Sequence, residues 1–516
     1  MDNLSPPRRL GAALLSGVVL SFAFGTNADP FVIEAVLGLI LLLFLSSGVR
    51  PRLAAACGFL HGVAFYGISL RWVHTVMRVH GGLSTWEASG VLASLVAAAS
   101  VFPALFSFCF CRLSRRSLTT ALLAAPFLWV TLEFARTRLP AIGFPWNLLG
   151  YAVRDNLTLL QITAVTGVYG LSFLLCAYCA LIVWSARALE SRGKKRAAGW
   201  FLVILAPLVP AVTSMADHWI PQEPPQHLAW LVQTNFPQAP SYPADWMSTH
   251  ARELDELERL SITAAQNGAE LVIWPEVPAP FSMQDAQFAA RAERIARATR
   301  SGFLFGVVDW KPGSNGGLSP YNSAALMGPS GRLVFLYDKI HLVPFGEYVP
   351  LRRWLGFAHQ LTAEVGEFQH GSLYRVGGIG GQKLGVFICY EAIFPSEVRR
   401  FTERGAGLLI NLSNDGWFGR SAAPPQHLMM ARVRAVENRR WLLRATNNGY
   451  TVAVDPYGRY AARLATDIRG ALAAPYGLRS DRTLYARWGD WLAWLCVAAT
   501  LYFLAAGARH GVPGQK

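Results

Sequence analysis

The chain has 516 residues, of which 53% are hydrophobic and 15% charged, with a formal net charge of +15. Soluble domains usually carry about 25% charged residues, so this composition excludes an ordinary soluble globular protein. The positive charge alone would suggest binding to nucleic acid, but the basic residues are spread over many short loops between apolar segments, which argues against that function.

Eight apolar segments are predicted to be membrane-spanning helices, because a hydrocarbon core of about 30 Å needs roughly 20 helical residues. They cover about 10–26, 30–48, 53–73, 88–111, 119–136, 158–185, 198–215 and 488–507. The first segment is short and follows Pro6-Pro7-Arg8-Arg9, so a signal peptide is the alternative. No clean small-residue cleavage site follows it and a second span begins almost at once, which favours a span.

Basic residues concentrate in alternate loops between these spans. One side of the membrane would hold 14 of them: Arg8, Arg9, Arg50, Arg52, Arg112, Arg115, Arg116, Arg187, Arg192, Lys194, Lys195, Arg196, Arg509 and Lys516. The other short loops hold fewer, with Arg78, Arg136, Arg138 and Arg154 as exceptions. The positive-inside rule then predicts that both termini are cytoplasmic and that the long insert before the last span faces outward.

Three domains follow from this pattern: a membrane domain over 1–218, an insert over 219–484, and a last span with a short tail over 485–516. Within the insert, strands alternate with amphipathic helices, which is typical of an α/β domain. Strands are predicted at 228–233, 270–274, 302–308, 322–327, 333–337, 384–388, 407–412, 441–446, 450–454 and 459–464. Helices are predicted at 247–266, 284–300, 395–404 and 425–438.

Three reactive side chains follow apolar strands of this insert. Leu271 to Pro275 leads to Glu276, Tyr337-Asp338 leads to Lys339, and Gly385 to Ile388 leads to Cys389. A carboxylate, an ammonium and a thiol delivered in this way indicate a base, an oxyanion stabiliser and a nucleophile.

Cys389 is the only cysteine outside the predicted spans. The others are Cys57, Cys109, Cys111, Cys176, Cys179 and Cys496. Cys176 and Cys179 have the C-x-x-C spacing, but inside a membrane helix this spacing is more typical of packing than of redox chemistry. Cys389 therefore has no soluble partner for a disulfide, and an unpaired outward-facing thiol indicates a chemical role.

These motifs, in this order, resemble the nitrilase (carbon–nitrogen hydrolase) superfamily and its Glu-Lys-Cys triad, here Glu276, Lys339 and Cys389. The spans, with Gly143 to Trp146 and Gly167 to Phe173, look like one branch of it, the apolipoprotein N-acyltransferases. The resemblance implies a polytopic α-helical membrane domain carrying a nitrilase-like α/β domain, an αββα sandwich, on the periplasmic side of the inner membrane.

The resemblance also implies the reaction. Cys389 would take a fatty acyl chain from a phospholipid, expected to be phosphatidylethanolamine, as a thioester. It would pass the chain to the α-amino group of the diacylglyceryl cysteine of an apolipoprotein. Only a few per cent of a free thiol is ionised at neutral pH, so Glu276 would remove its proton, while Lys339 and the backbone N–H of Tyr390 would bind the oxyanion.

Five further positions match the family's pattern. They are Glu347, Tyr390, Glu391, Trp417 and Trp246. Glu347 is expected to support the lysine, with a purely structural role as the alternative, and Trp417 to line a lipid-binding mouth, with core packing as the alternative. In the stretched segment from Asn235 to Trp246, either Trp246 or Tyr242 would contact substrate.

Aromatic residues on predicted loops provide a second link to lipid. Trp354, Phe357, Trp417 and Phe418 would dip into the bilayer and admit acyl chains. A greasy entrance would also keep water from the thioester, which favours transfer over hydrolysis. Glu34, Arg71 and Glu133 lie in or near spans, where ionisable groups are costly, and a functional role for them stays open.

No cofactor is expected. His341, His359, His370 and His427 show no metal-ligand spacing, and neither a phosphate loop nor a dinucleotide fingerprint occurs. The first alternative function is a membrane-tethered amidase that uses the same triad with water as acceptor. The others are a lipid or lipoprotein carrier that only binds, and a transporter, which the scarcity of charges in the spans and the lack of an internal repeat disfavour.

Overall fold

A computed structural model describes residues 4–25, 32–139, 143–190, 193–205, 208–238, 242–243, 245–313, 316–348 and 368–509. The chain divides into two compact units. Unit 1 comprises Met1–His74, Trp86–Ile220 and Trp488–Lys516, and unit 2 comprises Thr75–Thr85 and Pro221–Arg487. The short segment 75–85 thus belongs to unit 2, although the chain on both sides of it belongs to unit 1.

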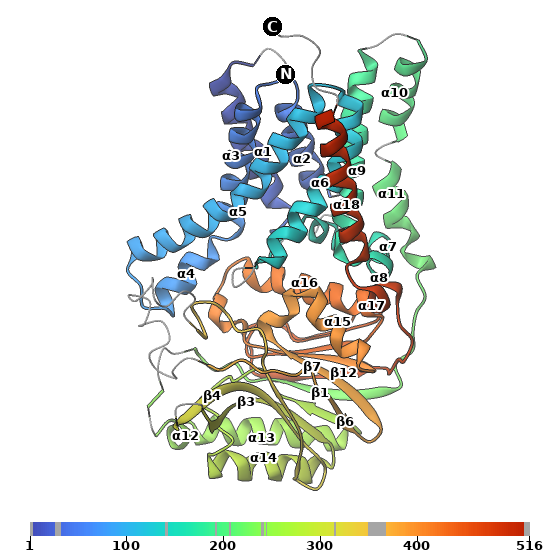
Figure 1. Cartoon of the computed structure of the whole chain (residues 1–516). Coiled ribbons are helices and arrows are strands. Elements are labelled where there is room, and N and C mark those ends of the chain that lie inside the picture. Colours follow the sequence, from blue (N-terminus) through green and yellow to red (C-terminus); the bar gives the residue numbers. More distant parts are fainter. Residues whose placement is uncertain are drawn as a thin grey trace. The chain divides into compact units, whose positions relative to one another are not determined.

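Unit 1 is helical (Figure 1). Its helices are α1 (Pro6–Phe22), α2 (Ile33–Ser46), α3 (Pro51–Ser69), α4 (Trp72–Val79, shared with unit 2), α5 (Thr85–Ser114), α6 (Leu118–Arg138), η1 (Leu149–Val153), α7 (Leu157–Leu160), α8 (Thr163–Thr166), α9 (Val168–Leu189), α10 (Lys194–Leu205), α11 (Leu208–Met215), η2 (Ala216–Trp219) and α18 (Trp491–Arg509).

Three of these helices, α5, α6 and α9, are long and apolar enough to cross a membrane, and the interrupted pair of α3 and α4 makes a fourth candidate. Among the described residues, α2, the α7–α8 segment and α18 are apolar but shorter. The protein is therefore a membrane protein with several candidate spans, and the number of eight stays a prediction.

Two predicted spans, the third and the sixth, were wrong in being continuous. The third, 53–73, ends at Ser69 and resumes at Trp72. The sixth, 158–185, is split into α7, α8 and α9, because Gly167 has φ +67° and turns the chain just before α9. The seventh, 198–215, contains helical residues of α10 and α11, and positions 206–207 between them lie outside the described residues.

Unit 2 contains two six-stranded sheets with the orders β12-β1-β2-β3-β4-β5 and β11-β10-β9-β8-β7-β6. Its strands are β1 (His227–Gln233), β2 (Leu271–Ile273), β3 (Gly302–Pro312), β4 (Leu318–Met327), β5 (Leu333–Asp338), β6 (Val376–Ile379), β7 (Gln382–Ile388), β8 (Leu408–Ser413), β9 (Leu442–Thr446), β10 (Val452–Val454), β11 (Tyr460–Arg463) and β12 (Gly470–Tyr476). Its helices are α12 (Trp246–Thr249), α13 (Ala251–Gln266), α14 (Ala286–Thr299), η4 (Cys389–Ile393), α15 (Pro395–Glu403), η5 (Asp415–Phe418), α16 (Ala423–Asn438) and α17 (Leu484–Trp488).

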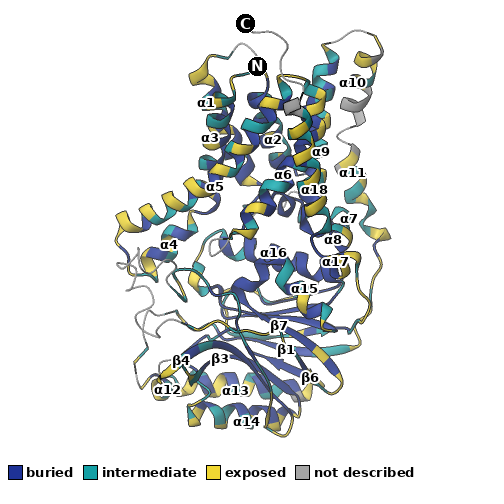
Figure 2. Ribbon diagram, in the orientation of Figure 1, coloured by how far each residue is buried: buried dark blue, intermediate teal, exposed yellow. Residues whose placement is uncertain are grey.

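The two sheets face each other, and helices cover their outer faces (Figures 1 and 2). The strands show why: Leu231 and Ile273 belong to the core between the sheets, whereas their neighbours Val232 and Val272 pack under α13 and α14. Both faces of β1 and β2 are therefore covered, which explains their apolar runs in the sequence. The predicted αββα sandwich is confirmed.

Ten predicted strands and four predicted helices of this unit are present with shifted ends. Two strands, β6 and β12, were not predicted. β6 forms a hairpin with β7 through Gly380 and Gly381, both with positive φ. β12 pairs antiparallel with β1. Strand β2 runs parallel to β1 and β3, and β8 runs parallel to β7 and β9. The carboxyl ends of such strands share an edge, where ligands of α/β proteins usually bind.

Candidate active site

The three reactive side chains lie just beyond strand ends of unit 2. Glu276 follows β2 by three residues, Lys339 follows β5 directly, and Cys389 follows β7 directly. Lys339 Nζ donates to Glu276 Oε1 at 2.9 Å, and the two side chains are only 1% and 6% exposed. The structure therefore brings the predicted carboxylate and ammonium into direct contact in a buried position.

Glu347 completes a buried ionic cluster around the ammonium. Lys339 Nζ also donates to Glu347 Oε1 at 3.0 Å, and Glu347 Oε2 accepts from the N–H of Val343 at 2.7 Å. Burial alone would lower the pKa of Lys339, but the carboxylates of Glu276 and Glu347 outweigh it and hold this pKa above its ordinary value. The lysine is therefore a cation at neutral pH, and its contact with Glu347 is an ion pair.

Two asparagines hold the carboxylates in place. Asn322, on β4, donates through Nδ2 to Glu276 Oε1 at 2.9 Å and to Glu347 Oε1 at 2.7 Å. The backbone N–H of Asn414, just after β8, donates to Glu276 Oε2 at 3.0 Å. Both oxygens of Glu276 are thus fixed by donors, which orients the carboxylate. Sequence reasoning missed both residues, because an asparagine within or just after a strand is ordinary until the sheets are paired.

Cys389 occupies a strained elbow between β7 and η4. Its φ of +48° lies in the left-handed region, which costs a residue with a side chain about 1–2 kcal/mol. The residue is 6% exposed. Burial raises the pKa of the thiol, the charge of Glu276 raises it further, and Lys339 opposes them. Both charges therefore act on the thiol, which is protonated at neutral pH and needs a base before it can attack.

Glu391 links the backbone just after Lys339 to the backbone just before Cys389 by hydrogen bonds. Its Oε2 accepts from the N–H of Ile388 at 2.7 Å. Its Oε1 accepts from the hydroxyl of Tyr337 at 2.7 Å and from the N–H groups of Ile340 and His341 at 2.8 and 3.2 Å. Burial raises the pKa of Glu391 to about 7, although the hydrogen bonds oppose this shift. Glu391 thus fixes the backbone on both sides of the site.

Tyr390 is buried beside the nucleophile. It is 7% exposed, and its ring lies edge-on to Phe394 at 5.3 Å between centroids. Burial raises the pKa of its hydroxyl, so the side chain is neutral at pH 7. The side chain packs below the elbow, which leaves its backbone N–H as the group expected to act in the reaction.

Two aromatic residues of the 235–246 segment, Phe236 and Trp246, lie in the core. Trp246 is 5% exposed and stacks on His250 at 4.3 Å between ring centroids. It also contacts Phe236 and Tyr242, whose ring centroids lie 5.1 and 5.9 Å away. Tyr242 is half-buried. The structure gives Trp246 a packing role, and a substrate contact for either aromatic stays a prediction.

Trp417 is on the surface of η5. It is 39% exposed, and its ring meets that of His80, from the 75–85 segment of unit 2, at 5.1 Å. Phe418 is half-buried, with its ring 5.9 Å from that of His427. A lipid-facing role for Trp417 stays a prediction. Trp354 and Phe357, predicted to act with it, lie outside the described residues, as does His359.

The remaining candidate histidines have structural partners. His341 Nδ1 lies 2.8 Å from Glu397 Oε1, and His370 Nδ1 lies 2.8 Å from the carbonyl of Ile340. Within the described ranges, no three His, Cys, Asp or Glu side chains group as a metal site would need. All seven cysteines are free.

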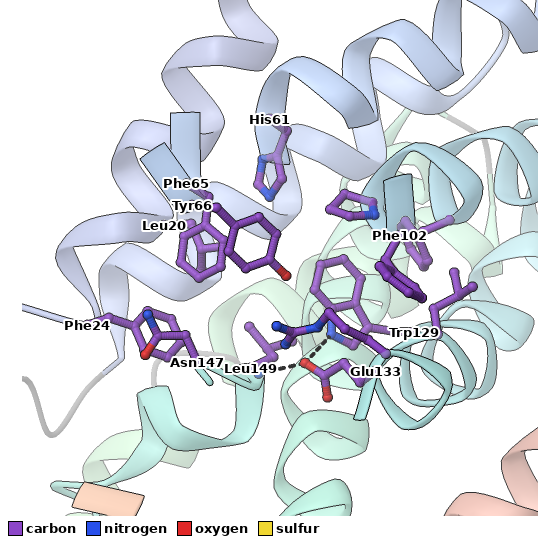
Figure 3. A pocket seen from close by; sticks show the side chains of 14 residues that line it. Leu20, Phe24, His61, Phe65, Tyr66, Phe102, Trp129, Glu133, Asn147 and Leu149 are labelled. Carbon is purple, nitrogen blue, oxygen red and sulfur yellow. Dashed lines mark hydrogen bonds between the residues drawn. The ribbon is translucent and has the colours of Figure 1, made fainter. Parts of the chain in front are cut away.

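Glu133 lines a small pocket in unit 1. Its Oε1 accepts from Trp129 Nε1 at 3.0 Å and from the N–H of Leu149 at 2.6 Å (Figure 3). The cavity, of about 30 Å³, has room for two or three water molecules. Arg136 and Asn147 also line it, and polar atoms of both have no hydrogen-bond partner among the described residues. A function for Glu133, and for Glu34 and exposed Arg71, stays open.

Comparison with known proteins identifies the family of each part of the chain. Residues 231–476 match the carbon-nitrogen hydrolase family, and residues 16–181 match the apolipoprotein N-acyltransferase N-terminal domain. Among solved structures, an amidase from Nesterenkonia sp. AN1 is 23% identical, with a TM-score of 0.37 over 50% of this chain and 92% of that chain. Nit3 of Saccharomyces cerevisiae, of the nitrilase superfamily, is 18% identical, with a TM-score of 0.38 over 49% and 90%. The family match over residues 231–476 makes this part of unit 2 a carbon-nitrogen hydrolase domain.

Relatives similar over nearly the whole chain narrow this class. The apolipoprotein N-acyltransferase of Geobacter metallireducens is 34% identical over 98% of this chain and 96% of its own length. That of Methylococcus capsulatus is 34% identical over 93% and 92%, and that of Pseudomonas syringae pv. tomato 32% over 87% and 87%. The chain belongs to the apolipoprotein N-acyltransferase family.

Proposed function

We propose that the protein transfers a fatty acyl chain from a phospholipid, through a thioester on Cys389, to the N-terminal α-amino group of an S-diacylglyceryl cysteine in apolipoproteins. The product is a triacylated lipoprotein. The observation that carries this proposal is the buried contact of 2.9 Å between Lys339 Nζ and Glu276 Oε1, next to the thiol, in a chain of this family.

The first half-reaction forms the thioester. Glu276 takes the proton of the Cys389 thiol as sulfur attacks the ester carbonyl of the phospholipid, and an S–C bond forms. The negative charge that develops on the carbonyl oxygen is stabilised by Lys339 and by the N–H of Tyr390. The ester C–O bond then breaks, and Glu276 returns the proton to the leaving oxygen, which departs as a lysophospholipid.

The second half-reaction transfers the chain. A neutral α-amino group attacks the thioester carbonyl, and the same two donors stabilise the second oxyanion. Glu276 accepts the proton that the amine loses as the C–N bond forms. The C–S bond breaks, and the proton passes to the departing sulfur, which restores the Cys389 thiol. One carboxylate can serve both halves, because Lys339, Asn322 and Asn414 fix its orientation.

The membrane frame suits two lipid substrates. Both the donor, for which we propose phosphatidylethanolamine, and the lipid-anchored acceptor diffuse within the bilayer. We place the enzyme in the inner membrane with eight spans, cytoplasmic termini and a periplasmic catalytic domain at about 219–484. The membrane domain then covers 1–218, and the last span and tail cover 485–516. The alternation of basic loops supports this orientation.

An intact-mass experiment tests the proposal. The purified full-length protein is incubated with phosphatidylethanolamine vesicles, and its mass is compared with that of Cys389→Ser. We expect the wild type to gain one fatty-acyl mass that hydroxylamine removes, and Cys389→Ser to gain none. Addition of a diacylated lipopeptide should discharge the adduct and lengthen the peptide by one acyl chain.

Other outcomes would select an alternative. Failure to form any adduct with phospholipid, combined with hydrolysis of small amides, would favour the amidase. Normal lipoprotein maturation by Cys389→Ala would favour a carrier. An adduct formed only with another phospholipid class would retain the reaction and correct the donor.

A further inference from the structure

A buried histidine contacts the backbone of the reactive cysteine. His427, in the second turn of α16, is 0% exposed, and its Nε2 lies 3.0 Å from the backbone carbonyl oxygen of Cys389. A carbonyl oxygen only accepts hydrogen bonds, so Nε2 carries a proton and donates it. The reaction described above makes no use of this side chain.

The other nitrogen of the ring faces an ion pair. His427 Nδ1 lies 3.1 Å from Arg444 Nη2 and 3.2 Å from Asp415 Oδ1. Burial and the charge of Arg444 lower the pKa of His427, although Asp415 opposes them. The ring is therefore neutral at pH 7. Because its proton is on Nε2, Nδ1 is left as an acceptor for Arg444.

The ion pair itself is rigidly held. Arg444 Nη2 donates to both carboxylate oxygens of Asp415, at 2.8 and 2.9 Å, and Ser413 Oγ donates to Oδ1 at 3.0 Å. Burial alone would raise the pKa of Asp415, but the charge of Arg444 outweighs burial and holds this pKa below its ordinary value. Both side chains of the pair are at most 1% exposed. Nδ1 of His427 thus contacts a charged pair that solvent does not reach, and this contact fixes the ring.

The carbonyl that His427 holds belongs to the peptide group between Cys389 and Tyr390. No described peptide bond is cis, and in a trans peptide the N–H points opposite to the C=O. The N–H of Tyr390 therefore points away from His427. Tyr390 is the second residue of η4, and the first N–H groups of a helix have no acceptor within it.

We propose that His427 is a positioning residue for the oxyanion hole: by holding the Cys389 carbonyl, it aims the N–H of Tyr390 at the oxygen of the acyl group on Cys389. A hydrogen bond to a peptide carbonyl also strengthens the N–H of the same peptide as a donor. This inference rests on the proposed function in its use of Cys389 as nucleophile. His427 itself touches neither the acyl donor nor the acceptor.

The contact also stabilises the elbow. Cys389 has φ +48°, and such a backbone persists only where its surroundings hold it. Glu391 holds the peptide between Phe387 and Ile388 through the N–H of Ile388, and His427 holds the peptide that follows the cysteine. A purely structural role would need only the contact of Nδ1 with the ion pair. The two roles therefore depend on different ring nitrogens.

A pair of substitutions separates the two nitrogens. In His427→Gln the amide reaches the place of Nε2 and can still donate to the Cys389 carbonyl. In His427→Asn the amide reaches only the place of Nδ1. The full-length variants are acylated with a p-nitrophenyl fatty ester, because attack on this ester passes through an oxyanion whatever the natural donor is. Alkylation of Cys389 by iodoacetamide, mapped by peptide mass, passes through no oxyanion and serves as the second readout.

We expect His427→Asn to lower the acylation rate constant by about 10²–10³-fold, the usual effect of losing one oxyanion donor. His427→Gln should recover most of this rate. Alkylation should change by less than about 3-fold in both variants, since Glu391 still holds the backbone before the elbow and neither Cys389 nor Glu276 is replaced. If the Asn variant does not fold, His427→Met replaces it, because Met fills the space without a donor. His227→Asn, in a histidine that bonds Glu270 at 2.7 Å, is the control.

Acylation of the Asn variant at the wild-type rate would overturn the proposal, as would equal losses in the Gln and Asn variants. A parallel loss of alkylation would instead assign His427 to the placement of the thiol and also contradict it. The proposed function fails separately, if the wild type reacts with the p-nitrophenyl ester but takes no acyl chain from any phospholipid.

Discussion

Glu276 and Glu347 accept hydrogen bonds from the same two donors, Lys339 Nζ and Asn322 Nδ2. The two carboxylates are therefore held side by side although they carry like charges. The ammonium neutralises one charge, and the amide of Asn322 provides a neutral bridge between the two oxygens. The following predictions use this arrangement.

Asn322→Asp should impair the enzyme more than Asn322→Ala. The alanine variant loses two hydrogen bonds to charged groups, each worth about 1.5–3 kcal/mol, and we expect acylation of Cys389 to fall by at least 10-fold. The aspartate variant adds a third negative charge to the cluster and should fall further. Rates of adduct formation in intact-mass spectra decide the order. Equal rates in wild type and Asn322→Asp would show that the bridge has no role in catalysis.

Glu276→Gln should lower both half-reactions. Its amide cannot accept a proton, and general-base catalysis typically contributes about 10²–10⁴-fold. We expect losses in that range for adduct formation from phospholipid and for discharge to a lipopeptide, each measured in single-turnover experiments. Glu270→Gln is the matched control, because Glu270 lies just before the other end of β2 and bonds His227. A loss confined to one half-reaction would contradict the use of one base for both.

Cys389 should be alkylated slowly in the free enzyme, with a rate that rises throughout the range from pH 6 to 9. Burial and Glu276 raise the pKa of this thiol, whereas an ordinary exposed thiol has a pKa of about 8.5. Stopped-time iodoacetamide labelling, mapped to the Cys389 peptide, measures this profile. A plateau below pH 8 would indicate a preformed thiolate and remove the need for Glu276 in acylation.

Glu391 should make stability fall as the pH rises towards neutrality. Burial raises its folded-state pKa to about 7 from a reference value of 4.5, so the folded protein binds this proton more tightly than the unfolded chain does. Its contribution is complete below about pH 4.5 and is lost as the pH rises through 7; the maximum is about 3 kcal/mol.

Urea unfolding followed by tryptophan fluorescence at pH 5 and 8 tests this effect. Glu391→Gln cannot ionise and should show a shallower pH dependence than the wild type. The same dependence of the unfolding free energy on pH in both proteins would mean that Glu391 is ionised throughout this range. Its four hydrogen-bond donors would then outweigh the effect of burial. Activity should change in the opposite direction, because the ionised carboxylate holds the Ile388 and Ile340 N–H groups best.

Membrane orientation is tested by single added cysteines. The two variants are Ser330→Cys and Arg115→Cys. Ser330 lies in an exposed turn of unit 2, and Arg115 lies in an exposed loop between α5 and α6. An impermeant maleimide should label the first in cells with a permeable outer membrane, and the second only after the inner membrane is opened. Most native cysteines are buried, so their background is low. The reverse labelling pattern would invert the proposed topology.

The architecture of unit 2 was largely predictable, because apolar runs buried on both faces identify strands regardless of their partners. β12 was missed because its sequence, Gly470 to Tyr476, is rich in alanine and contains glycine and proline, which disfavour strands. Its pairing with β1, more than 200 residues away, decides its conformation. β6 left a usable signal, since the pair Gly380-Gly381 is typical of a tight hairpin.

The reactive residues were easier to predict than the residues that hold them. Glu276, Lys339 and Cys389 have distinctive chemistry at strand ends, so the sequence indicates them directly. Asn322, Asp415 and His427 are ordinary in sequence, and their partners become visible only when both sheets and α16 are in place. Continuous spans were predicted from hydropathy, which does not respond to a single turning residue such as Gly167.

The ionic cluster of Lys339, Glu276 and Glu347 has one more negative than positive charge, since two carboxylates surround one ammonium. In a buried place such an excess attracts a cationic amine and repels anionic groups. An approaching N-terminus would thus be drawn in as its ammonium form and must lose a proton before it can attack. A fatty-acid anion would be repelled, so anionic lipids without an ester should be poor inhibitors of this enzyme.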